Sequence, residues 1–135
     1  MAQRTAFLSK LIGLYCLLYG LSMLVHRQVT IEEVAALVGN PAAILLTGVI
    51  VLPAGIAIVL VHNVWRGGPL PVIVTLIGWA TLLKGLALVF LPPSGVTAYM
   101  AGLGYEHMFY LYAALTVIIG AYLTYGGFRS ASVPR

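Results

Sequence analysis

The chain has 135 residues, of which 61% are hydrophobic and only 7% are charged, and its formal net charge at pH 7 is +4. A soluble domain carries about 25% charged residues, so this chain has too few to cover a surface that faces water. Disorder requires low hydrophobicity and high charge, and it is excluded as well. With a mean hydropathy of +1.05, the sequence predicts an integral membrane protein.

Four long apolar segments follow one another along the chain. Because about 20 apolar residues cross a bilayer as a helix, four crossings with short connections use up the length. The expected spans are residues 8–26, 41–62, 70–91 and 104–127. No site of the Ala-x-Ala type follows the first segment, which favours a retained helix over a signal peptide. We therefore expect an all-α fold, in which residues 1–135 form a single transmembrane domain with a four-helix bundle.

The connections between the spans also carry local signals. Residues 30–39 predict a short amphipathic helix at the membrane interface. Thr30 and Glu33 have the spacing of a capping box, Gly39 suits a helix end, and Pro41 suits the start of the second span. The segment 94–104 is expected to be a glycine-containing loop with at most a half-turn of helix.

The distribution of charge predicts the orientation in the membrane. With four spans, both ends of the chain lie on one side, which carries five basic residues: Arg4, Lys10, Arg66, Arg129 and Arg135. The other side carries Arg27, beside Glu32 and Glu33. The positive-inside rule then places both ends in the cytoplasm. No basic cluster predicts nucleic-acid binding, and the single cysteine, Cys16, excludes an intramolecular disulfide.

Lys84 lies within the third span, where a charge is costly and indicates function by default. It stands seven residues before Leu91, which puts it about 10 Å below the outer interface at a rise of about 1.5 Å per residue. Two interpretations stay open. Either the ammonium reaches outward to one of the acidic residues, or it lines an ion pathway or balances the charge of a ligand. The acidic residues on that side are Glu32, Glu33 and Glu106.

Pro53 falls inside the second span, should kink it, and leaves the Val49 carbonyl without its helical donor. Val49 is expected at about the depth of Lys84, so we expect the ammonium to approach this region or an outer carboxylate rather than lipid. Tyr19 and Tyr112 fall near the same level. Their hydroxyls need partners when buried, so a network of lysine and tyrosines is one hypothesis.

His26 and His107 are expected at outer helix ends, with Glu106 beside His107. These three residues are candidates for binding a quinone or haem in the outer leaflet. No motif such as C-x-x-C-H or H-E-x-x-H supports the hypothesis, so we expect no cofactor and no metal. The chain contains no aspartate, hence no Ser–His–Asp set, and no nucleotide-binding glycine pattern occurs. We therefore expect no enzymatic activity.

Small residues on two of the spans predict close helix packing. They are Thr75, Gly78 and Gly85 in the third span, and Thr116, Gly120 and Thr124 in the fourth.

One stretch of the chain resembles a known group of proteins. The motif positions are His62, Asn63, Trp65 and Trp79, which belong to the runs His62–Trp65 and Val74–Trp79, and Lys84-Gly85 follows. The pattern is similar to that of small, uncharacterised bacterial inner-membrane proteins with an H-N-x-W turn and a V-T-x-x-G-W…K-G third helix. The resemblance covers the second and third spans. It implies an architecture that occurs as a free-standing small protein, and it implies no activity.

From these features we expect a non-catalytic accessory or assembly subunit of a homo-oligomer or of a larger membrane complex. The expected partners are the lipid bilayer and either the chain itself or a larger membrane protein complex, without nucleic acid. The alternative is a small channel or transporter with Lys84 lining the path. A third hypothesis is the quinone or haem site.

Overall fold

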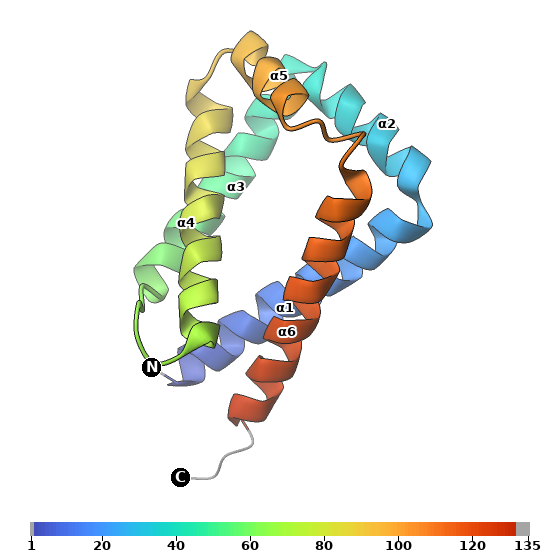
Figure 1. Cartoon of the computed structure of the whole chain (residues 1–135). Coiled ribbons are helices and arrows are strands. Elements are labelled where there is room, and N and C mark those ends of the chain that lie inside the picture. Colours follow the sequence, from blue (N-terminus) through green and yellow to red (C-terminus); the bar gives the residue numbers. More distant parts are fainter. Residues whose placement is uncertain (1, 132–135) are drawn as a thin grey trace.

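The computed structural model describes residues 2–131, which form six helices and no strand (Figure 1). The helices are α1 (Ala2–Val25), α2 (Arg27–Val38), α3 (Pro41–Val61), α4 (Pro69–Phe90), α5 (Pro93–Gly102) and α6 (Phe109–Ala131). Four of them, α1, α3, α4 and α6, are long and apolar enough to cross a membrane. The expected all-α bundle with four membrane helices is confirmed, and the chain is a multi-pass membrane protein.

The four long helices pack as two antiparallel pairs, α1 with α6 and α3 with α4 (Figure 1). Gly13 of α1 faces Thr124 of α6, and Gly55 of α3 faces Leu82 of α4. The loop 62–68 joins α3 to α4. The helices of the other pair, α1 and α6, come from the two ends of the chain and lie on either side of α3 and α4 in the sequence. Contact between the pairs is made chiefly by α1 with α4, while the short helices α2 and α5 touch at the end away from the termini.

Glycines form the contact line within each pair. Each span contains two buried glycines that are seven residues apart: Gly13 and Gly20, Gly48 and Gly55, Gly78 and Gly85, Gly120 and Gly127. A Cβ atom at any of these positions would lie within 2.9 Å of the facing helix. A spacing of seven residues keeps one face of a helix toward its partner, and small residues on that face let the two backbones approach closely. The predicted small faces on α4 and α6 therefore lie at helix contacts.

The two halves of the chain repeat one order of elements: a long helix, a short helix and a second long helix. Under this correspondence α1 matches α4 and α3 matches α6, so the pair α1–α6 matches the pair α4–α3. The glycine spacing matches as well. The matched helices run in the same direction in the two halves, and this is the arrangement of a parallel repeat.

The start of α2 differs from the sequence expectation, and the capping box was wrong. The helix begins at Arg27 after the N-cap His26, which makes no side-chain capping bond. Thr30 lies inside the helix, where its buried hydroxyl donates to the His26 carbonyl at 2.9 Å. The expected end at Gly39 and start at Pro41 are confirmed.

The segment after the third span is also more helical than expected. Instead of a loop over residues 94–104, it forms α5, which begins at Pro93, a residue suited to a first helical turn. The fourth long helix begins at Phe109 and not at residue 104. Gly104 explains the difference, because its φ of +57° belongs to the left-handed region and makes a turn between the two helices.

Two small buried clusters hold the helices together at opposite ends. Leu8, Ile12, Val74 and Leu123 join α1, α4 and α6 at the end that carries the termini. Met23, Phe109 and Ala113 join α1 and α6 near α2 and α5.

Candidate functional site

Four motif positions that the sequence singled out come together at the end of the molecule that carries the termini. Asn63 Oδ1 accepts a hydrogen bond from Trp65 Nε1 at 2.7 Å and a second from Trp79 Nε1 at 3.4 Å. The neighbouring His62 is almost completely buried. Because Asn63 and Trp65 lie in the loop 62–68 while Trp79 lies in α4, the shared acceptor ties the loop to the helix.

Thr75, which the sequence indicated only as a small packing residue, is the centre of a second set of bonds. Its buried hydroxyl accepts from the Val64 N–H at 2.9 Å, and its single hydrogen is shared between the carbonyls of Val64 and Pro71, each 3.0 Å away. His62 Nε2 lies 3.2 Å from the Pro71 carbonyl. Since a carbonyl only accepts, Nε2 carries the hydrogen in this contact. We refer to His62, Asn63, Trp65, Thr75 and Trp79 as the loop cluster.

The loop cluster fixes the connection between α3 and α4. Backbone groups of Val64, which no helix can satisfy, are bound by the Thr75 hydroxyl, and both indole N–H groups have an acceptor. The signal for this threonine in the sequence was its place inside the run Val74–Trp79. The chemistry of the cluster is that of a structural clamp.

Thr75→Val is expected to lower the free energy of unfolding by about 1–3 kcal/mol, because it leaves buried polar groups of Val64 unpaired while keeping the side-chain shape. Thermal unfolding in mild detergent, followed by circular dichroism, measures the loss. Thr97→Val is the matched control, since the exposed Thr97 hydroxyl bonds only to the Pro93 carbonyl of its own helix. Equal stability of the two variants would contradict the clamp.

Lys84 lies exposed near the middle of the pair formed by α3 and α4, and it makes no hydrogen bond or ion pair with any residue that the structure describes. Its neighbour Gly85 packs against Leu52 of α3. Successive helical residues point about 100° apart, so Lys84 is turned away from this contact. The expected approach to Val49 or to an outer carboxylate is therefore not made within residues 2–131. Pro53 lies inside α3 as expected.

The tyrosines of this hypothesis contact other tyrosine rings, and one of them bonds to the backbone. Tyr112 donates its hydroxyl to the Leu103 carbonyl at 2.8 Å, and its ring stacks on Tyr105 at 5.9 Å. The ring of Tyr19 stacks on Tyr15 at 5.9 Å. Burial, together with the nearby Tyr19, raises the pKa of the Tyr105 hydroxyl and keeps it protonated. The hypothesised network of Lys84 with Tyr19 and Tyr112 is not formed among the described residues.

His26, Glu106 and His107 are all exposed, and within residues 2–131 no hydrogen bond or ion pair joins any two of them. The described part of the chain contains no group of three or more His, Cys, Asp or Glu side chains able to hold a metal ion. The basic group near His26 is Arg27, which lies 5.7 Å from the ring centre of Phe109 and 5.3 Å from that of Tyr110. These cation–π contacts hold the start of α2 against α6.

Two apolar grooves open between the helix pairs. One lies between α1 and α3 and has a volume of about 490 Å³. The second lies between α4 and α6 and measures about 370 Å³. Lys84 lines neither groove, whereas Gln3 and Arg4 stand at one end of the first.

In comparisons with known proteins, no protein-family model, no curated protein and no solved structure matches the chain.

Proposed function

We propose that the protein is a non-catalytic accessory or assembly subunit of a larger membrane complex, in which Lys84 pairs with a carboxylate on a membrane helix of a partner. One observation carries this proposal: a lysine within a membrane span is exposed and has no polar partner among the described residues. Charged residues in membrane helices normally face protein or a water-filled cavity and pair with another group.

The acidic residues of the chain favour a partner of a different kind over a second copy. The only three are Glu32, Glu33 and Glu106, and all of them lie outside the four spans. A second copy would have to supply one of these from α2 or from the segment before α6. A membrane helix of a different protein, with an aspartate or glutamate at the level of Lys84, forms the pair without moving a carboxylate into the membrane from α2 or from the segment before α6.

The same proposal puts the chain in a bacterial inner membrane with both ends in the cytoplasm. This location agrees with the resemblance of its second and third spans to small bacterial inner-membrane proteins. Basic residues at the end that carries the termini support this orientation. They are Arg4, Lys10, Arg66 and Arg129. The fifth, Arg135, lies outside the described residues.

Native mass spectrometry of tagged protein, extracted mildly from its own membranes, tests the proposal. The wild type is expected in a complex of fixed stoichiometry, Lys84→Arg is expected to keep it, and Lys84→Ala is expected to lose it at least about tenfold, since a charged pair contributes about 1.5–3 kcal/mol. Leu83→Ala, a change at the exposed neighbouring position, is the control. A complex that survives in Lys84→Ala, or a wild type that is always a single chain, would contradict the proposal.

A further inference from the structure

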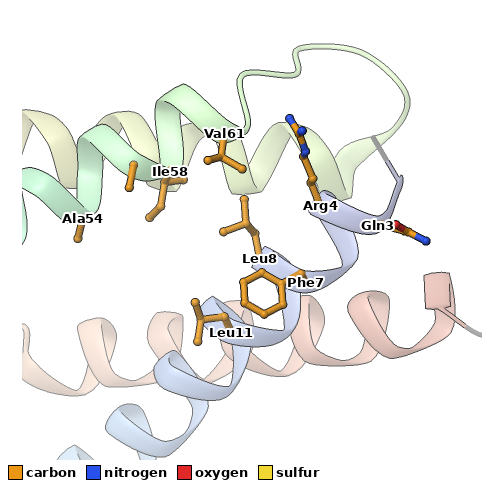
Figure 2. A pocket seen from close by; sticks show the side chains of 9 residues that line it. Gln3, Arg4, Phe7, Leu8, Leu11, Ala54, Ile58 and Val61 are labelled. Carbon is orange, nitrogen blue, oxygen red and sulfur yellow. The ribbon is translucent and has the colours of Figure 1, made fainter.

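The groove between α1 and α3 has apolar walls along its length, and two polar residues, Gln3 and Arg4, stand at one end of it (Figure 2). Phe7 and Leu11 of α1 face Ala54 and Val61 of α3 along its length, and Arg4 stands at the end beside Val61. Phe7 is 63% exposed and Leu11 is 56% exposed, so the groove is open to the surroundings of the helices. In a membrane protein those surroundings are lipid.

Arg4 has no anionic partner in the described part of the chain. It is exposed and makes no hydrogen bond or ion pair there. The basic residue one to two turns further along, Lys10, has its Nζ 4.6 Å from the ring centre of Phe128 on α6. The three glutamates of the chain belong to α2 or to the segment between α5 and α6, at the opposite end of the molecule. The described residues 2–131 therefore supply no anion for Arg4.

We propose that this groove binds an anionic phospholipid, with one acyl chain along the apolar walls and the phosphate on the Arg4 guanidinium. An apolar groove with a basic residue at its end suits a phospholipid, which joins an apolar chain to an anionic head. Guanidinium binds phosphate through two parallel hydrogen bonds. The volume of about 490 Å³ lies within the range of about 300–1,000 Å³ that is usual for ligand sites.

The test uses the full chain in nanodiscs that contain equal amounts of phosphatidylglycerol and phosphatidylcholine, followed by native mass spectrometry after release. The wild type is expected to retain phosphatidylglycerol. Arg4→Gln should lower this retention about tenfold, as expected for the loss of a charged hydrogen-bonded contact. Arg4→Lys, which keeps the charge, should retain more than Arg4→Gln. Arg66→Gln, at the same end but outside the groove, is the control for charge.

A second pair of variants tests the apolar part of the site. Ala57→Trp adds an indole to the groove wall and should abolish retention, whereas Ala80→Trp on an exposed position of α4 should not. Equal retention of the two lipids, or retention that does not depend on Arg4, would overturn the proposal.

The alternative occupant of the groove is a second copy of the chain. Oxidation of a variant with a single cysteine in the groove distinguishes this case from a bound lipid. Because Cys16 is the only cysteine, a Cys16→Ser, Leu11→Cys variant carries one thiol, placed in the groove. Oxidation in the phosphatidylglycerol nanodiscs is expected to give no covalent dimer. A high yield of dimer would show that a second copy, and not a lipid, fills the groove.

Discussion

Gly55→Ala is expected to destabilise the protein, although alanine favours a helix over glycine by about 1 kcal/mol. The added Cβ would lie 2.5 Å from the Cα of Leu82, so the backbones of α3 and α4 must move apart. Overpacking of this kind costs about 1–3 kcal/mol, and more where backbone rather than a flexible side chain must shift. Because backbone atoms of Leu82 must shift, the upper end of this range applies, and subtracting the gain of about 1 kcal/mol in helix propensity leaves an expected net loss in the free energy of unfolding of about 2 kcal/mol.

Gly102→Ala provides the matched control for this prediction. Gly102 ends α5, and a Cβ atom there would have no other atom within 4 Å. The same chemical change should therefore leave stability unchanged or raise it slightly. Thermal unfolding in detergent can be followed by the fluorescence of Trp65 and Trp79, the only two tryptophans, which report on the loop that joins the two helices. If Gly55→Ala were as stable as Gly102→Ala, the close contact of α3 and α4 would be refuted.

The sequence predicted the membrane class and the four spans because these depend on composition and on the length of apolar segments. It placed the ends of α3 and α4 within a residue or two, where Pro41 and Pro69 begin the helices. It predicted the short helix α2 but placed its start three residues too late, and it expected a loop where α5 forms. Thr30 has the pattern of an N-cap but bonds back to His26 inside a helix, since a threonine hydroxyl can do either.

The arrangement of the helices was beyond the sequence interpretation, although one signal was present. The spacing of seven between Gly13 and Gly20 recurs in every span and marks the faces in contact, but it does not say which helix lies opposite. Of the candidate residues, His62, Asn63, Trp65 and Trp79 lie in one region because hydrogen bonds hold the loop 62–68 against α4. Lys84 could not be placed, because the direction of a single side chain depends on the rotation of α4 about its axis.

The two-pair arrangement also gives α1 and α6 a contact that can be tested apart from α3 and α4. Gly120→Ala is expected to destabilise, because the new Cβ would lie 2.5 Å from the backbone nitrogen of Leu17. Gly126→Ala in the same helix should cost little. There the Cβ would meet only the end of the Leu70 side chain, which can change its rotamer.

Combining changes in the two pairs measures how far they depend on each other. Gly55 contacts α4 and Gly120 contacts α1, so the two glycines share no partner. Changes at sites without shared partners usually add to within about 0.3–0.5 kcal/mol. The Gly55→Ala, Gly120→Ala double variant should therefore lose the sum of the two single losses, as measured by unfolding in the same detergent. A clearly smaller or larger loss would mean that the pairs fold as one packed unit rather than as two units joined through α1 and α4.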